Sequence, residues 1–119
     1  MKQNIKGISI GIGVKNAQEA LDWYKQLLGN VEVMEPVPGL FELKLSDTTW
    51  LQLDDTGYLE LGGKSSIIRF ETENIENAYE LTKKITSDIE EINVVDGVVK
   101  YFDFKDLSGN RLSFVQIME

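Results

Sequence analysis

The sequence predicts an α+β fold made of two modules that share the element order β-α-β-β-β. Three observations support it: apolar residues alternate strictly near the start of the chain, an amphipathic helix pattern follows at once, and both patterns recur with Asn74 in the place of Asn16, 58 positions later. An internal repeat of this kind decides the fold class. Two such modules would keep their helices outside and curve their mixed sheets around a cup.

The first strand is expected at residues 7–14, where isoleucine and valine at the even positions alternate with glycine and serine at the odd positions. A period of two with one apolar face is typical of a half-buried strand. The opposite face carries almost no side chains, and we interpret the space that this leaves as a candidate binding site. Asn16, with Glu19 three residues later, is suited to begin a helix, and Gly29 is suited to end it.

Three further strands should complete the first module, around residues 31–34, 40–45 and 50–53, with a turn at 46–48. Pro36 and Pro38 are expected to end the first of the three.

The second module should repeat this order after a polar, glycine-bearing connection. Its elements are expected as a strand at 65–72, a helix that begins at Asn74, strands at 92–95, 98–104 and 111–117, and a turn at 106–110. The sequence thus predicts one domain, 1–119, with modules at about 5–54 and 64–119 joined by 55–63.

Composition excludes several kinds of function. The chain has no cysteine and no histidine, so it contains no disulfide, thiolate nucleophile, histidine base or histidine-ligated metal. A net charge of -8 argues against nucleic acid and weakly favours a cationic ligand, although acidity also serves solubility alone. Because no apolar run approaches about 18 residues, we expect no membrane span or signal peptide and a cytoplasmic protein.

The first module contains the motifs Ile-Gly-Ile-Gly-Val-Lys-Asn at 10–16, Ala-Leu-Asp-Trp-Tyr at 20–24 and Leu-Leu-Gly at 27–29. The second ends with Phe-Lys-Asp-Leu-Ser-Gly-Asn-Arg-Leu at 104–112. Together these motifs resemble the vicinal oxygen chelate superfamily, which includes glyoxalase I, extradiol dioxygenases, fosfomycin-resistance proteins and bleomycin-binding proteins. The closing motif usually reads Phe-x-Asp-Pro-x-Gly-Asn, and Leu107 stands here in place of the proline. The resemblance covers nearly the whole chain.

The resemblance implies a divalent metal in the cup, with one ligand from the first and last strand of each module. Carried over by position, the four ligand residues are Ser9, Gln52, Ile67 and Ser113. The family has mostly histidine and glutamate there, whereas an isoleucine side chain cannot ligate and neutral hydroxyl or amide oxygens are poor ligands. We therefore expect no metal and no cofactor. The chain looks similar to the metal-free bleomycin-binding branch, whose small, acidic, dimeric members sequester a cationic drug.

Alternation places further side chains on the faces turned away from the helices. Across the first hairpin, Glu42 should face Gln52 and Lys44 should face Trp50. Trp50 could stack on a planar or cationic ligand, or instead fill the core or a subunit contact. Arg69 could pair with an acidic group of a ligand, or be held by a carboxylate of the chain such as Glu71 or Asp103. The residues expected to bind the ligand are Ser9, Glu42, Trp50, Gln52, Arg69, Tyr101, Asp103, Arg111 and Ser113.

Three functions fit these observations. The first is a metal-independent homodimer that sequesters or senses an organic ligand, aromatic or cationic, in the cup, with no nucleic acid or membrane partner. The second is a lyase, isomerase or other enzyme that works without the usual metal and uses Glu42, Asp103 or Glu71 with Arg69 as an acid-base and electrostatic set. The third is a structural or regulatory dimer module without a ligand. The sequence leaves open whether the cup closes within one chain or across two.

Overall fold

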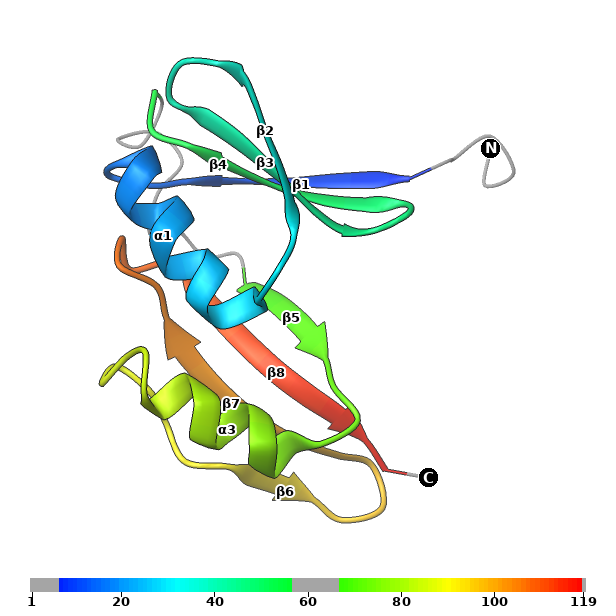
Figure 1. Ribbon diagram of the computed structural model, residues 1–119. Helices are drawn as coiled ribbons and strands as arrows, with labels where there is room; N and C mark the ends of the chain where they lie inside the picture. The colour runs from blue at the N-terminus through cyan, green and yellow to red at the C-terminus, as the bar shows by residue number, and fades with distance from the viewer. Residues whose placement is uncertain (1–6, 57–66, 119) are drawn as a thin grey trace. The chain divides into compact units, whose positions relative to one another are not determined.

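The computed structural model describes residues 7–56 and 67–118 of the chain (Figure 1). The chain divides into two compact units, Met1–Gly62 and Gly63–Glu119. In its described part, each unit holds a four-stranded mixed sheet and one helix, which confirms the predicted α+β class. Of the segment expected to join the modules, 55–63, the part from residue 57 onward lies outside the described residues.

Unit 1 follows the predicted β-α-β-β-β order. Its elements are β1 (Ile8–Gly13), α1 (Ala17–Leu28), β2 (Glu32–Val37), β3 (Leu40–Ser46) and β4 (Thr49–Asp54). The strands lie in the order β1-β4-β3-β2, with β1 parallel to β4 and the other neighbours antiparallel. Helix α1 connects β1 at one edge of the sheet to β2 at the other edge; these two strands run in the same direction, and such a connection needs a crossover.

Helix α1 begins and ends where the sequence predicts. The side-chain oxygen of Asn16 accepts a hydrogen bond from the backbone N–H of Glu19 at 2.9 Å. A second free N–H of the first turn, that of Ala17, donates to the Asp55 carboxylate at 2.9 Å. Gly29 ends the helix with φ of 83°, a left-handed conformation that favours glycine. The caps Asn16 and Gly29 are therefore local in the sequence, whereas the contact of Ala17 with Asp55 comes from the residue after β4.

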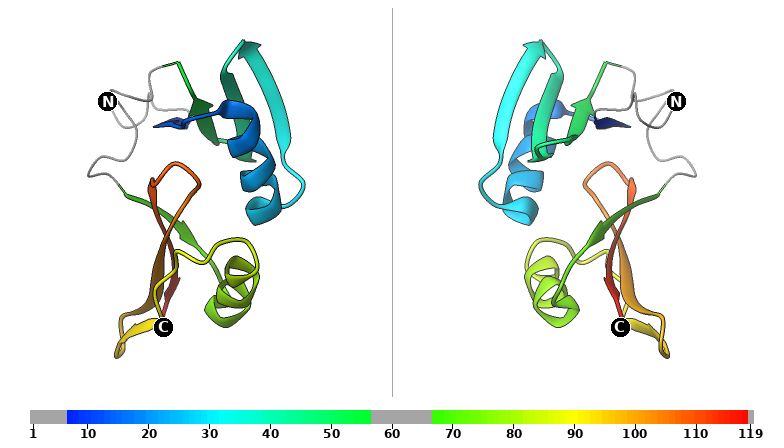
Figure 2. Two further views of the ribbon diagram at one scale, coloured as in Figure 1. Left: turned by 90° about the vertical axis from the view of Figure 1, so that its left-hand side faces the viewer. Right: turned by 90° about the vertical axis from the view of Figure 1, so that its right-hand side faces the viewer.

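The core of unit 1 lies between α1 and one face of its sheet, as the side views show (Figure 2). Tyr24 of the helix and Leu43, Leu51 and Leu53 of the sheet are fully buried. These leucines alternate along β3 and β4 with polar residues of the other face, as a period of two requires. The alternation thus gives the sheet one helix-covered face and one open face.

Strand β2 differs from the prediction that Pro36 would end it. The strand continues through Pro36 to Val37, and its register against β3 shifts between Met34 and Val37. The physical reason is position: β2 is the edge strand of its sheet, where a residue without an N–H group is tolerated at an irregularity. Pro38, which follows, lies outside the strand as expected.

Unit 2 repeats the order with different lengths. Its elements are β5 (Ile67–Glu71), α3 (Ile75–Lys83), β6 (Asn93–Val95), β7 (Val99–Lys105) and β8 (Arg111–Ile117). The strand order is β5-β8-β7-β6, with β5 parallel to β8. Asn74 caps α3 by accepting a hydrogen bond from the N–H of Asn77 at 3.0 Å, which confirms the second predicted helix start.

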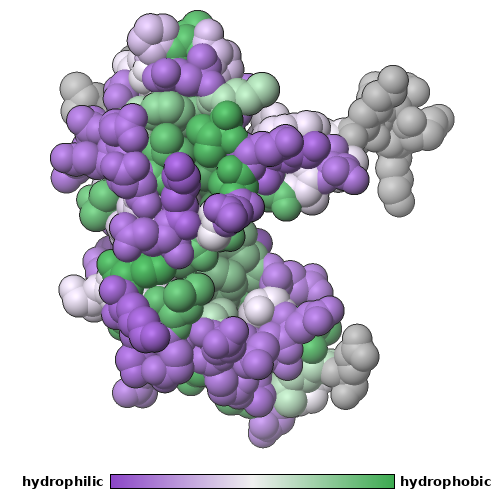
Figure 3. All heavy atoms as spheres, in the orientation of Figure 1, coloured by the Kyte–Doolittle hydropathy of each residue, from purple (hydrophilic) through white to green (hydrophobic). Residues whose placement is uncertain are grey.

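Aromatic side chains build the core of unit 2 beneath α3. Phe102 is fully buried, and its ring contacts those of Tyr79, Phe104 and Phe114 at centroid distances of 5.1, 5.7 and 5.6 Å. The outer surface over α3 is mainly hydrophilic (Figure 3). The helix therefore presents an apolar stripe to its sheet and a charged stripe outward.

The predicted turn between β7 and β8 is held by one buried carboxylate. Asp106 accepts hydrogen bonds from the backbone N–H groups of Ser108 and Asn110, both at 2.8 Å, and from the Asn110 side chain at 2.9 Å. Such a turn fixes the register of the two strands that carry most of the open face of unit 2.

No helix within residues 7–56 or 67–118 has the length and apolar character needed to cross a membrane.

Candidate functional site

Each unit has a candidate site of its own, the open face of its sheet, defined as the face turned away from α1 in unit 1 and from α3 in unit 2. The open face of unit 1 carries Ser9, Gly11, Glu42, Lys44, Trp50 and Gln52. The open face of unit 2 carries Ile67, Arg69, Glu71, Val99, Tyr101, Asp103, Lys105, Arg111, Ser113 and Val115. Every sequence-predicted ligand-binding residue therefore lies on one of these two faces.

The open face of unit 1 is held together by its own polar groups. Glu42 lies opposite Gln52 and Lys44 opposite Trp50, which confirms the predicted hairpin register. The Gln52 side-chain amide donates to the Glu42 carboxylate at 2.9 Å. Lys44 forms ion pairs with Glu32 at 3.9 Å and with Asp47 at 3.7 Å. These charged groups therefore have partners within the unit.

The glycine face of β1 accommodates side chains from β4. A Cβ atom at Gly7 would lie 2.6 Å from the backbone oxygen of Thr48 and 3.0 Å from ring atom Cζ3 of Trp50, and one at Gly11 would lie 3.4 Å from Oε1 of Gln52. The contact with Thr48 is closer than real Cβ contacts, so its backbone excludes a larger residue at Gly7, and the ring of Trp50 lies tightly against the same space. The space that the sequence predicts beside β1 is thus occupied in part by Trp50 and Gln52.

Corresponding positions of the two sheets form what we call the central rows. The central row of unit 1 is Glu42, Gln52 and Gly11, on three neighbouring strands. The central row of unit 2 is Asp103, Ser113 and Arg69, with Ser113 as the register partner of both others.

In the second row the middle residue is too short to serve its neighbour. The hydroxyl of Ser113 donates to the backbone carbonyl of Phe114 at 3.4 Å. Oxygen Oδ1 of Asp103 is buried and receives no hydrogen bond from any donor among the described residues. Arg69 is exposed and forms no salt bridge with any acidic residue within 7–56 and 67–118. Glu71 and Asp103, the two carboxylates expected to hold it, are among the residues that it does not pair with. The row therefore presents a carboxylate and a guanidinium that do not neutralise each other.

A hollow lies over this part of unit 2. Its volume is about 450 Å³, and it is lined by Arg69, Val99, Tyr101, Asp103 and Val115. Ligand pockets typically have volumes of about 300–1,000 Å³, so the hollow is large enough for a small organic molecule. The lining combines an apolar floor with one group of each charge, as pockets that orient a ligand commonly do.

Sequence reasoning missed Val99 and Val115 as lining residues. Both follow from the same alternation that placed Tyr101 and Asp103, because Val99 is two residues before Tyr101 and Val115 is the register partner of Tyr101. Their signal was available, but a search for polar and aromatic side chains passes over valines.

The four positions that correspond to family metal ligands do not fit a metal ion. Ile67 offers no donor atom, the hydroxyl of Ser113 is buried and directed to a backbone carbonyl, and the amide nitrogen of Gln52 is bound to Glu42. Divalent metals prefer imidazole, thiolate or carboxylate donors, and the four residues supply none of them. Within the described part of the chain, no group of three or more histidine, cysteine or acidic residues is arranged to hold a metal ion.

Arg111 and Tyr101 occupy different surroundings. Arg111 lies opposite Lys105 and lines a small hollow of about 100 Å³ together with Asp88, Glu90 and Asp103. This hollow is too small for an organic ligand, whose pockets begin at about 300 Å³. Tyr101 is half-buried beside the larger hollow. The structure thus brings Arg69, Tyr101 and Asp103 together around one space.

Solved structures share this architecture over almost the whole chain. A glyoxalase/bleomycin resistance protein from Catenulispora acidiphila superimposes with a TM-score of 0.76 at 17% identity, over 93% of this chain and 97% of that one. The chain has the glyoxalase/bleomycin resistance protein fold. This confirms, at the level of the fold, the resemblance to the vicinal oxygen chelate superfamily. No protein-family model matches the sequence, and no curated protein does.

Proteins of different kinds share the fold. TnmS3, an antibiotic binding protein from Streptomyces sp. CB03234, matches with a TM-score of 0.76 at 16% identity, over 93% of this chain and 94% of that one. A lactoylglutathione lyase from Agrobacterium tumefaciens matches with a TM-score of 0.72 at 12% identity, over 92% and 91%. Since the fold hosts both binding and catalysis, function must be argued from the residues of the site.

Proposed function

We propose that the protein binds a small organic molecule on the open face of its sheets and sequesters or senses it without a metal ion. The observation that carries the proposal is the hollow of about 450 Å³ on unit 2, lined by valines, a tyrosine and two groups of opposite charge. The donor chemistry of Ser9, Gln52, Ile67 and Ser113 supports metal independence. The antibiotic binding activity named for TnmS3 agrees with such a role.

The proposal includes a homodimer in the cytoplasm, as in the bleomycin-binding proteins that the sequence resembles. Native mass spectrometry of the freshly purified protein tests the homodimer and the metal independence together. We expect a dimer mass without a metal ion, and an added organic mass would provide the first candidate ligand. A bound divalent metal would contradict the proposal, because residues other than Ser9, Gln52, Ile67 and Ser113 would then supply the metal ligands.

Trp50 tests whether unit 1 contributes to binding. Its ring lies on the open face, where a planar or cationic ligand can stack on it. In a thermal-shift screen with aromatic amines and aromatic acids, Trp50→Ala should reduce the stabilisation caused by the best compound. Stacking on an aromatic ring contributes about 1 kcal/mol, which corresponds to roughly a fivefold weaker affinity. Leu107→Ala, at an exposed residue of the last turn, is the matched control.

An enzyme that uses Glu42 as a base is the competing function. The bond from the Gln52 amide favours a structural role for Glu42, because it holds the carboxylate in place and takes up one of its oxygens. Glu42→Gln decides between the two functions. Ligand binding should survive this substitution if the protein only binds. A turnover that disappears in Glu42→Gln while binding remains would establish the enzyme.

A further inference from the structure

We infer that the ligand bound by unit 2 is a small zwitterion with an apolar group, whose protonated amine contacts Asp103 and whose carboxylate contacts Arg69. This inference rests on the proposed small-molecule binding and specifies its chemistry. Three observations carry it: a buried carboxylate oxygen that lacks a donor, a cation at the other end of the same row, and an apolar hollow that joins them.

The oxygen Oδ1 of Asp103 is the strongest of the three observations. Buried polar atoms in folded proteins almost always have a hydrogen-bond partner, and a buried ionised oxygen without one is costly. Oδ1 of Asp103 is buried and accepts no hydrogen bond from the described residues. Asp103 itself lines the hollow of about 450 Å³ and also the neighbouring hollow of about 100 Å³. A donor entering the larger hollow, and above all a protonated amine, would therefore supply the missing partner.

Arg69 defines the other end of the ligand. It lies two strands away from Asp103 in the central row of unit 2, so their Cα atoms are separated by about 10 Å, twice the usual spacing between neighbouring strands. The two side chains form no salt bridge with each other. A molecule that carries an amine and a carboxylate a few ångströms apart can bridge this gap over the small Ser113, with each charge against its opposite.

The apolar part of the ligand has a defined place. Val99 and Val115 line the same hollow as Tyr101, and Val115 is the register partner of Tyr101. An aromatic or branched aliphatic group placed there would bury surface against two valines and stack on one ring. The hollow thus favours a molecule with a charged head and an apolar body over an ion alone.

Two further hollows carry no comparable demand. One, of about 540 Å³, is lined in part by Lys100 and Gln116, whose polar groups already bind Glu76 at 3.4 Å and the Ile75 N–H at 2.8 Å. The other, of about 100 Å³, is also lined by Asp103 but is below the size of ligand pockets. Charged residues of both signs line this small hollow with Asp103, namely Asp88, Glu90, Lys105 and Arg111.

A matched set of four probes tests the inference: phenylalanine, phenethylamine, 3-phenylpropionate and 2-phenylethanol. They share a phenyl group and differ in carrying both charges, the positive charge, the negative charge or neither. Binding is measured by NMR titration that follows the amide signals of Val99, Tyr101 and Val115. We expect phenylalanine to bind most tightly and the neutral alcohol most weakly.

Two variants, one isosteric and one shortened, test which residue contacts the amine of the ligand and which contacts its carboxylate. Asp103→Asn should weaken phenylalanine and phenethylamine by about tenfold, as expected for a lost hydrogen bond between charged groups, and leave the alcohol unchanged. Arg69→Gln should weaken phenylalanine and 3-phenylpropionate in the same way. Asp22→Asn and Lys25→Gln on the exposed face of α1 change the net charge equally and should have no effect.

Three other outcomes would overturn the inference. Each of them can be told apart from a failure of the proposed small-molecule binding. If the alcohol binds as tightly as phenylalanine at these amides, unit 2 binds small molecules without reading their charge. If Asp103→Asn acts no more strongly than Asp22→Asn, Asp103 does not contact the amine. If no probe shifts these amide signals, the zwitterion is excluded, and the proposed function is then decided by the organic adducts in native mass spectrometry.

Discussion

The two units build the same sheet and complete its open face in opposite ways. In unit 1, Gln52 stands in the middle of the central row and reaches Glu42 with its amide at 2.9 Å. In unit 2, Ser113 stands in the same place and is too short, so its hydroxyl turns to the backbone and Asp103 keeps a buried oxygen without a donor. On β1 the row ends in Gly11, whereas on β5 it ends in Arg69.

This difference gives the proposed binding site to one of two similar modules without a change of fold. The backbone register is the same in both rows, and only side-chain length decides whether the carboxylate is satisfied from within. A group satisfied from within stabilises the unit, while a group left without a partner favours a ligand. The proposed site therefore rests on an unsatisfied polar atom rather than on a sequence motif.

The largest expected effects concern the helix-covered faces, where the units should behave alike. Leu51 and Phe102 are both fully buried, one in each core. Leu51→Ala should lower the free energy of unfolding by about 2–5 kcal/mol and Phe102→Ala by about 3–5 kcal/mol, since each removes apolar contacts and leaves a cavity. Urea denaturation followed by circular dichroism measures both. A loss below 1 kcal/mol in only one variant would mean that the two cores differ as much as the open faces do.

Intermediate effects should separate the two central rows. Glu42→Ala leaves the part-buried Gln52 amide without its acceptor and should cost about 1 kcal/mol. Asp103→Ala breaks no such bond at Oδ1 and removes an unpartnered buried oxygen, so the midpoint of thermal unfolding should stay the same or rise. Differential scanning calorimetry of the two variants measures the contrast. Equal destabilisation would show that Asp103 has a structural partner after all.

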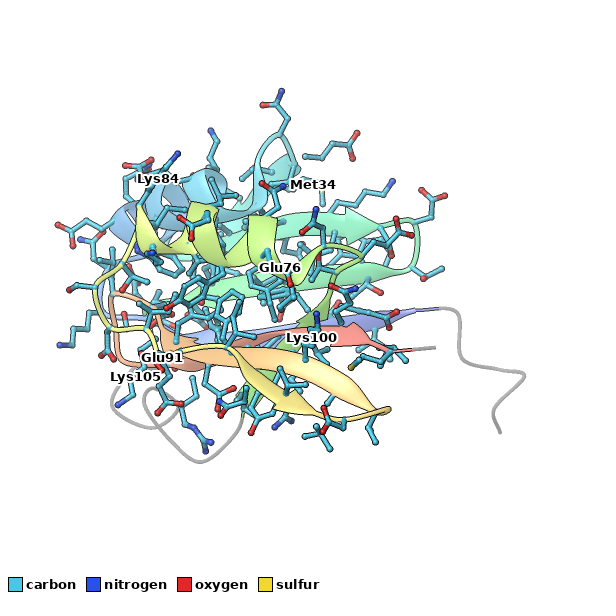
Figure 4. All side chains as sticks on the ribbon, turned by 90° about the horizontal axis from the view of Figure 1, so that it is seen from below. Met34, Glu76, Lys84, Glu91, Lys100 and Lys105 are labelled. Atoms are coloured by element: carbon cyan, nitrogen blue, oxygen red, sulfur yellow. The ribbon has the colours of Figure 1, made fainter. Side chains whose placement is uncertain are left out.

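The smallest effect concerns an ion pair between helix and sheet that only unit 2 has among the described residues. Glu76 of α3 and Lys100 of β7 lie 3.4 Å apart (Figure 4), whereas Gln18, the counterpart of Glu76, is neutral and binds Asp22. A hydrogen bond from its own backbone is the largest cause that lowers the pKa of the Glu76 carboxyl below 4.5; desolvation opposes it, and the hydrogen bond and charge of Lys100 lower the pKa further.

Because the pKa is lowered by folding, Glu76 adds stability above pH 4.5 that is lost as the pH falls through its folded value. An NMR titration should give a Glu76 midpoint below 4.5, and Lys100→Gln should raise it only in part, since the backbone bond is the larger cause. Complete return to 4.5 in Lys100→Gln would reverse this order of causes.

The fold was largely predictable because its signals are local. Alternation along residues 8–13 and 40–45, and the caps Asn16 and Asn74, each determine an element without reference to the rest of the chain. The end of β2 was not predictable in this way. Whether a proline ends a strand depends on whether the strand lies at the edge of its sheet, and that is a property of the whole unit.

The candidate site was predictable only to the level of the face. Period-two patterns placed Glu42 and Asp103 on open faces, and the hairpin turn gave the pairing of Glu42 with Gln52. Which carboxylate lacks a partner depends on the reach of the residue beside it, and the contrast between Gln52 and Ser113 acquires meaning only once both rows are aligned in space. The role of Trp50 in binding stays a prediction.

The proline within β2 also bears on how this protein behaves at high concentration. An edge strand with regular N–H and C=O groups can template the addition of strands from other molecules, which is a common first step of aggregation. Pro36 removes one donor and coincides with the register shift in β2, so this edge cannot be extended regularly. The same residue that makes the end of the strand hard to predict therefore protects one border of the sheet during crowding and storage.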